Sequence, residues 1–144
     1  MNYKTLFNAV KTELEKIPEL KDRVRIYNSD DTSSGYPFVN ISGFAKTRVL
    51  GGTCLVEETG TIELTLFQEI NADNSGKTRG TDVVLDIMSK IDDTLDANRN
   101  LSGAVDGLDD IMLTNANTGY VDNTLNCKTY VFTLTYNAHK GLTH

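Results

Sequence analysis

Segment 71–78, Asn-Ala-Asp-Asn-Ser-Gly-Lys-Thr, is the part of this sequence whose residue types come nearest to a chemical motif. Its closing Gly-Lys-Thr lies between a predicted strand and a predicted helix, where a phosphate-binding loop would lie. Such a loop needs a second glycine where Asn71 stands, because its backbone must wrap around the phosphates. No strand ending in a magnesium-binding Asp follows at a suitable distance. We therefore predict an ordinary strand-to-helix turn.

The same segment also places oxygen-bearing side chains at alternate positions, as a calcium loop does. Asn71, Asp73 and Ser75 precede a glycine, and Asp82 falls at the twelfth position. However, the first ligand is not Asp, a strand precedes the loop, and Asp82 is shorter than the bidentate Glu that calcium loops use. We expect no metal site and no cofactor.

Residues able to act as acid, base or nucleophile are scarce. The two histidines, His139 and His144, lie near the C-terminus, and the two cysteines are far apart in the sequence. Paired aspartates such as Asp92 and Asp93 are neighbours in sequence, but general acid–base catalysis needs carboxyl groups held in a shared cleft. We predict that this protein is not an enzyme.

Length and charge restrict the classes of function further. The chain has 144 residues, 39% of them hydrophobic, so we expect one domain. Its net charge is -6, so we expect no general binding of nucleic acid through phosphate contacts. Charged residues interrupt the apolar positions of residues 1–16, and no apolar run is long enough to span a bilayer, so we expect neither a secretory signal nor a membrane partner. Nine aspartates lie between residues 82 and 122, where the cations are Lys90 and Arg99.

The elements that must position these residues begin with a helix over residues 1–18. Leu6, Val10 and Leu14 recur at helical spacing and form an apolar stripe, and Pro18 ends the helix. Short strands are expected at 24–27 and 36–44 because apolar and β-branched residues alternate there.

The middle of the chain combines an arm, a strand and a second helix. Residues 45–60, in which Gly51-Gly52 and Gly60 bracket short extended pieces, predict a long β-arm or flexible hairpin. Alternating residues over 61–70 predict a strand, and an apolar stripe over 81–97 predicts the second helix.

The last third is predicted as loops and strands. Residues 98–109 and 115–124 are loops by composition, 110–113 is a short strand, 125–136 is a regular strand, and 137–144 is a flexible tail. The element order predicts a single α+β domain over residues 1–144, with a mainly antiparallel sheet, two helices on one face and a β-arm.

This succession resembles the tail terminator, or tail-completion, proteins of long-tailed bacteriophages over nearly the whole chain. The features that carry the resemblance are a proline after an aromatic residue at Tyr36-Pro37, a strand ending near Gln68, and a closing strand with alternating aromatic residues. The matching segments are YKTLFNAVKTELEKI (3–17), VRIY (24–27), YPFVNISGF (36–44), TIELTLFQE (61–69), TDVVLDIMSKIDDTL (81–95), DIML (110–113) and CKTYVFTLTYN (127–137).

The resemblance implies a non-enzymatic virion subunit, assembled in the host cytoplasm and located at the head-tail junction. Such proteins form a ring, expected to be a hexamer, on the last ring of the tail tube and stop its polymerisation. The implied partners are further copies of the chain, the tail tube protein and the head-tail connector protein, while DNA passes through without specific binding. The alternatives are a head-completion or neck adaptor protein and a monomeric module that binds a protein or a ligand.

A head-to-tail ring needs two unlike, complementary patches on each subunit. We predict that basic residues of the first half meet the acidic second helix across subunits, or that this helix and the 106–110 loop line the lumen. A solvated acidic face that serves only solubility is the alternative. The interface candidates are Lys21, Arg23, Arg25, Lys46, Arg48, Asp82, Asp86, Asp92, Asp93 and Asp96, and the lumen candidates are Asp106, Asp109 and Asp110.

Overall fold

A computed structural model describes residues 2–27, 37–52, 54–69, 80–109, 111–117 and 127–141. The motif-like segment 71–78 and Asp110 lie outside these residues. The predicted turn there stays a prediction.

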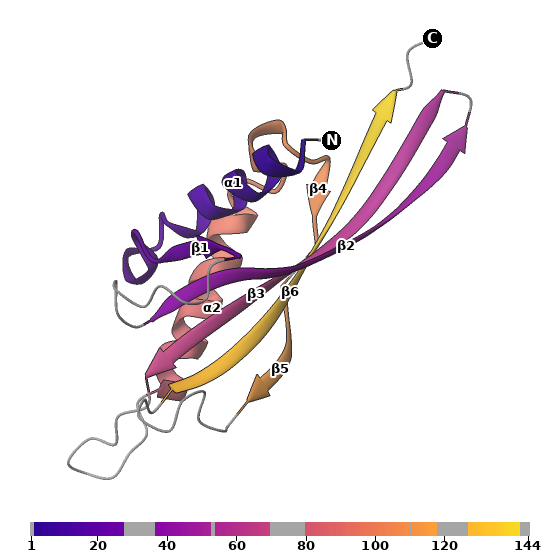
Figure 1. The fold of residues 1–144 in the computed structure, drawn as a ribbon. Coiled ribbons are helices and arrows are strands. Elements are labelled where there is room, and N and C mark those ends of the chain that lie inside the picture. The colour runs from indigo at the N-terminus through magenta and orange to yellow at the C-terminus, as the bar shows by residue number, and fades with distance from the viewer. Residues whose placement is uncertain are drawn as a thin grey trace, which may run out of the picture.

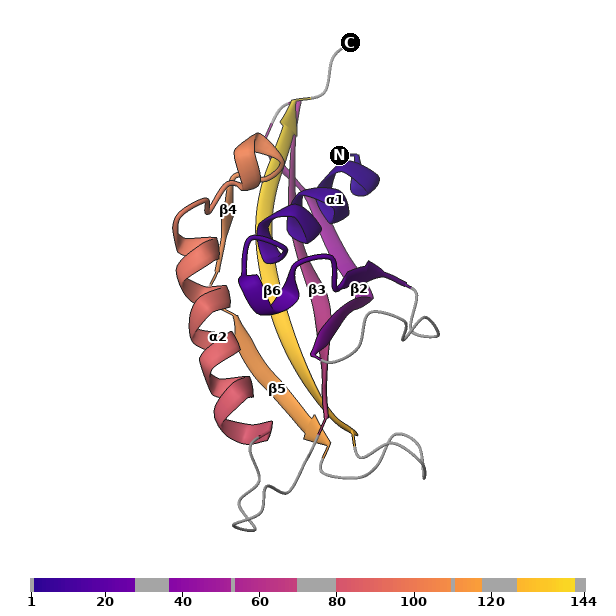
Figure 2. The same cartoon turned by 90° about the vertical axis from the view of Figure 1, so that its left-hand side faces the viewer.

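The described chain is an α+β unit in which two helices lie on one face of a mostly antiparallel sheet (Figure 1), as the sequence predicts. Figure 2 shows both helices on that face, α2 nearer the edge of the sheet. The elements are α1 (Tyr3–Leu14), η1 (Pro18–Leu20), β1 (Val24–Ile26), β2 (Phe38–Gly52), β3 (Leu55–Glu69), α2 (Gly80–Asp96), η2 (Leu101–Gly103), β4 (Gly107–Leu108), β5 (Met112–Asn117) and β6 (Cys127–Gly141).

The strand order in the sheet is β1-β2-β3-β6-β4, and β5 also pairs with β6. β1 is parallel to β2, and the other pairs are antiparallel. The three long strands β2, β3 and β6 therefore form the centre of the sheet. The two outer sides differ, since one is formed by β1 and the free part of β2, and the other by β4 and β5.

The core lies between the helices and the sheet. Leu6, Val10 and Leu14 of α1 are fully buried, as the helical spacing predicts. The core cluster also includes residues of α2 and of one face of β3 and β6, among them Val84, Ile87, Ile91, Leu95, Ile62, Leu64, Leu66, Tyr130, Phe132, Leu134 and Tyr136. Burial of each large apolar side chain contributes about 1.5–3 kcal/mol.

The first helix is shorter than the predicted 1–18. It begins after Asn2, whose side chain accepts a hydrogen bond from the Thr5 backbone N–H at 3.1 Å, and it ends at Leu14. The residue before a proline is pushed out of the helical conformation, and Ile17 is accordingly extended. Pro18 instead starts the short helix η1.

The predicted arm over residues 45–60 is the outer half of a long hairpin. A third strand, which was not predicted, pairs with it. Residues 137–141, predicted as a flexible tail, continue β6 and pair with β3 as far as Leu55 and Gly141. Polar composition is typical of a flexible tail, which is why a tail was predicted. Here polar residues occur in a strand because this half of the sheet extends past the helices into solvent (Figure 1). We call residues 45–52, 55–60 and 137–141 the arm.

Two predicted loops also contain regular structure. Residues 98–109 include η2 and β4, and the strand β5 runs to Asn117, past the predicted start of the 115–124 loop. Gly, Asn and Asp are frequent in these segments, so composition alone favours loops. Pairing with β6 supplies the backbone hydrogen bonds that composition does not predict.

Gly60 is expected to be required for stability because its position is covered by an aromatic ring. A Cβ atom there would lie 2.3 Å from Cε1 of Tyr136. We predict that Gly60→Ala lowers the free energy of unfolding by about 1–3 kcal/mol, measured by urea denaturation. Gly107→Ala is the matched control, since its nearest atom, Oδ1 of Asn137, is 3.8 Å away. Equal effects of the two substitutions would contradict this account.

Candidate functional site

A buried carboxylate lies at the base of the arm. Glu58 on β3 is 4% exposed, and its Oε2 accepts a hydrogen bond from the Tyr136 hydroxyl at 2.6 Å. Its Oε1 accepts a hydrogen bond from the Tyr3 hydroxyl at 3.0 Å and lies 3.5 Å from Nε of Arg48. A buried charge is tolerated when it is paired and hydrogen-bonded, and these three groups, from three elements, meet that need.

The register of the sheet brings these groups together. Gly60 is directly opposite Tyr136 on β6, and Glu58 is directly opposite Arg48 on β2. Because Gly60 has no side chain, the ring of Tyr136 lies across β3 and its hydroxyl reaches Glu58. Burial raises the pKa of Tyr136 above its usual value, and the hydrogen bond to Glu58 and its negative charge raise it further.

The pairing of Glu58 with Tyr136 is not among the sequence predictions, although the alternation of residues along β3 contains a signal for it. Glu58 is an even number of residues from Ile62 and Leu64 on the same strand, so it faces the core side of the sheet. A charged residue on that face needs a partner, and a hydroxyl group on the same face of β6 could be that partner.

The N-terminal helix is attached to the arm through Tyr3. Nζ of Lys46 lies 4.0 Å from the centre of the Tyr3 ring and also donates a hydrogen bond to the Tyr3 hydroxyl. The Tyr3 ring packs against Phe44 with centroids 5.2 Å apart. Lys46, an interface candidate from the sequence, therefore already has partners within its own chain.

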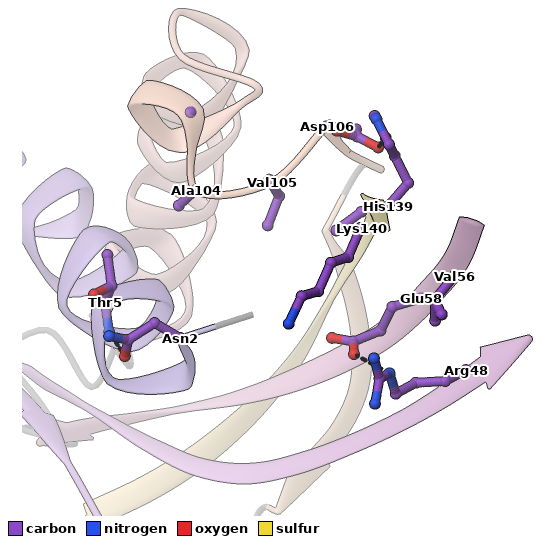
Figure 3. Close-up of a pocket in the computed structure, with 12 residues that line it drawn as sticks. Asn2, Thr5, Arg48, Val56, Glu58, Ala104, Val105, Asp106, His139 and Lys140 are labelled. Atoms are coloured by element: carbon purple, nitrogen blue, oxygen red, sulfur yellow. Dashed lines mark hydrogen bonds and ion pairs between the residues drawn. The ribbon is translucent and has the colours of Figure 1, made fainter. Parts of the chain in front are cut away.

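A pocket of about 400 Å³ lies beside this cluster, between the arm, the start of α1 and the 103–106 loop (Figure 3). Arg48 and Glu58 lie on the arm side, and Lys140 extends from β6 toward Asn2 and Thr5. These groups offer two cations, a carboxylate and helix-start polar groups. The pocket can therefore hold a small polar group or a side chain of another protein.

The tip of the arm has the opposite chemistry. Residues 49–56, Val-Leu-Gly-Gly-Thr-Cys-Leu-Val, contain no charged residue. Every residue of β2 from 45 to 52 is exposed, including Val49 and Leu50. An exposed apolar strand end of this kind usually marks an interaction surface or an aggregation risk.

The basic interface candidates do not form one patch. Lys21 and Arg23 precede or begin the β1 region, and β1 pairs only with residues 39–41 of β2. Arg25 lies over the ring of Phe38, 4.5 Å from its centre. The β1 region lies beside the helix-covered half of β2, whereas Lys46 and Arg48 are on the arm.

The acidic candidates on α2 are partly neutralised within the chain. Asp86 lies 3.0 Å from Nζ of Lys90, which also bonds Glu19 at 2.5 Å. The hydrogen bond from Lys90 lowers the pKa of Glu19. Asp96 lies 2.5 Å from Arg99, and Asp92 also has an interaction within the chain. Asp93 is exposed, and the side chain of Asp82 lies outside the described residues.

The lumen candidates lie apart from these. Asp106 is exposed and pairs with His139 of β6, beside the pocket and at the base of the arm. Asp109 is exposed just before β5. The acidic segment of the sequence is therefore divided in space between α2 and the base of the arm.

The described ranges lack two further kinds of feature. They contain no group of three or more His, Cys, Asp or Glu side chains arranged to hold a metal ion. Neither described helix has the length and hydropathy needed to cross a membrane.

We predict that the hydroxyl of Tyr136 contributes measurably to stability. Tyr136→Phe removes a donor from the buried Glu58 and should lower the free energy of unfolding by about 1–3 kcal/mol in urea denaturation at neutral pH. Tyr27→Phe is the matched control because Tyr27 is 55% exposed, and its effect should stay within about 0.5 kcal/mol. A Tyr136→Phe protein as stable as the control would show that Glu58 does not need this partner.

The same residue predicts a dependence of stability on alkaline pH. The usual pKa of a tyrosine is 10.0, and that of Tyr136 is raised in the folded protein. As the pH rises above 10, the unfolded state loses this proton first, so the contribution of Tyr136 to stability falls. Urea denaturation at pH 8 to 11 should show the wild type losing stability faster than Tyr136→Phe. Parallel curves would contradict the raised pKa.

Comparisons with known proteins do not place the chain in a family. No protein-family model matches it, and no curated protein matches it significantly.

Proposed function

We propose that this chain is a non-enzymatic structural protein of a bacteriophage virion, which forms a ring on the end of the tail tube. The ring stops polymerisation of the tube and offers a surface to the head-tail connector. The observation that carries the proposal is the arm, a three-stranded extension of the sheet beyond its helices that ends in an uncharged, exposed tip. The resemblance in element order to tail terminator proteins supports it.

The two sides of the sheet suit a head-to-tail assembly. β1 covers only three residues of β2, and β5 pairs with β6 on one side. The opposite sides therefore present unlike strand edges, and unlike surfaces are what a closed ring of identical subunits joins. Unprotected edges also cost solubility in a free monomer, so burial between subunits is the favourable state.

The charge distribution is compatible with the passage of DNA. The chain carries a net charge of -6, and Lys90 and Arg99, the cations of the acidic segment, each lie beside a carboxylate of α2. DNA gains affinity where phosphate contacts with Lys and Arg release counterions, so a surface with net negative charge binds it weakly. DNA is therefore a passing molecule in this proposal and not a ligand.

A head-completion or neck adaptor ring fits the same arm, and the two roles differ in the partner that the ring meets. The pocket beside Glu58 favours a further candidate, a monomeric module that binds a small ligand or a protein segment. That candidate needs no association of the chain with itself. The oligomeric mass separates it from the ring proposals.

We predict that the purified protein forms a closed oligomer, expected to be a hexamer, whose mass native mass spectrometry measures. Phage particles that lack it should have overlong or unattached tails in electron micrographs. The matched particle control carries the gene for Tyr27→Phe, which should give normal tails. A protein that stays monomeric at high concentration and fails to bind tail tube subunits would contradict the proposal.

A further inference from the structure

We infer that the pocket between the arm and the start of α1 binds a carboxylate group carried on a small apolar body. The inference concerns a single subunit, so it does not depend on the proposed ring. It comes from three features of the pocket: an apolar floor, two cations that reach it from neighbouring strands, and carboxylates that already have partners.

The floor of the pocket is the core face of the sheet, continued past the start of α1 (Figure 1). Val56 on β3 lies an even number of residues from the core residue Ile62, so it faces the helix side of the sheet. Ala138 on β6 is likewise in phase with the core residue Leu134. Both are buried and line the pocket together with buried Val105. This floor can therefore cover a hydrocarbon group of a few carbons.

Two cations approach the floor from the strands on either side of β3. Arg48 on β2 is directly opposite Glu58, and Lys140 on β6 is directly opposite Val56, so both are on the helix side. Because β2 and β6 are each one strand from β3, they lie about 10 Å apart. Figure 3 shows Lys140 extending into the pocket toward the start of α1. Two long side chains can thus reach the same anionic group above β3.

The carboxylates that line the pocket are engaged within the chain. Glu58 accepts hydrogen bonds from two tyrosine hydroxyls and also contacts Nε of Arg48. Asp106 pairs with His139. Glu57, the neighbour of Glu58, is on the opposite face of β3 and does not line the pocket. The first turn of α1 contains no acidic residue. An incoming anion therefore meets no unpaired carboxylate among the described lining residues.

The donors of the pocket are used only in part. The contact of Arg48 with Glu58 is through Nε at 3.5 Å, and its terminal nitrogens have no partner among the described residues. Lys140 has none in the same part of the chain. Asn2 caps α1 with its amide oxygen, so its amide N–H groups can still donate. A planar carboxylate accepts hydrogen bonds of this kind from several donors at once.

Charge balance favours a carboxylate over a phosphate. Arg48 is balanced by Glu58, whereas Lys140 is a charge without a partner in the described lining. A carboxylate brings one negative charge, which Lys140 balances. A phosphate brings about 1.5–2 charges at pH 7, and the excess would lie beside buried Glu58. The apolar floor also favours a ligand with a hydrocarbon body.

Two probes represent the two sources of such a group. 4-Methylpentanoate represents a free organic acid, and acetyl-Gly-Leu represents the C-terminus of a protein chain. In NMR titrations both should shift the methyl signals of Val56, Val105 and Ala138, and each should bind at least about tenfold more tightly than its amide. Acid and amide share the apolar body, so the difference measures the contribution of the charge. The acid that binds more tightly identifies the source.

Substitutions test the two cations. Lys140→Met keeps the length of the side chain but removes its charge, and it should weaken the binding of both acids at least about tenfold. Arg48→Lys keeps a charge beside Glu58 but loses the terminal nitrogens, and it should weaken binding at least about threefold. Lys21→Met removes an exposed charge outside the pocket, so this matched control should bind as the wild type does. Circular dichroism checks that each variant is folded.

Four results would overturn the inference. Equal affinities for acid and amide would show that the pocket does not recognise the charge, and wild-type affinity in Lys140→Met would show that this lysine is not the ligand's partner. Inorganic phosphate bound as tightly as the acids would indicate a general anion site. Methyl signals that do not shift with either acid up to about 10 mM would show that the pocket takes no carboxylate. The oligomeric mass is measured separately, so the ring proposal is tested independently of these results.

Discussion

The hydrogen bond from Tyr136 to Glu58 is the point at which the exposed arm is attached to the core. It is a contact between β6 and β3, made possible by the bare backbone of Gly60 between them. Glu58 also accepts a hydrogen bond from Tyr3, so the first turn of α1 is held to the same carboxylate. A single buried charge thus joins the helix layer, the hairpin and the last strand, and the loss of any one donor leaves it less well compensated.

This attachment lets a strand pass from one environment to another without a break. On β2 the residues from Phe38 to Ile41 are buried, and those from residue 45 onward are exposed. An isolated hairpin in water is marginally stable, but the third strand β6 and the anchored base give the arm a fixed direction. The arm can therefore present an apolar tip at a defined place, which a flexible loop could not.

Periodicity predicted the helices and the buried faces well because they follow from local alternation. Leu6, Val10 and Leu14 on α1 are examples, since their spacing alone places them on one side. The continuation of β6 through residues 137–141 could not be predicted in the same way. Its stabilising partner, β3, is some 80 residues away in sequence, and its exposed residues Asn137, His139 and Lys140 are polar. The pairing of Glu58 with Tyr136 likewise depends on register, which local patterns do not determine.

Electrostatics and apolar burial have separate roles in the proposed ring. On α2, Asp86 and Asp96 lie beside Lys90 and Arg99, so the field beyond this helix is weaker than the count of aspartates suggests. Exposed charges are also screened over about 8 Å at physiological salt. They can therefore steer and orient neighbouring copies but supply little lasting affinity. In the proposed ring, the free energy that holds copies together would come from burial of apolar surface, and the uncharged tip of the arm offers such surface.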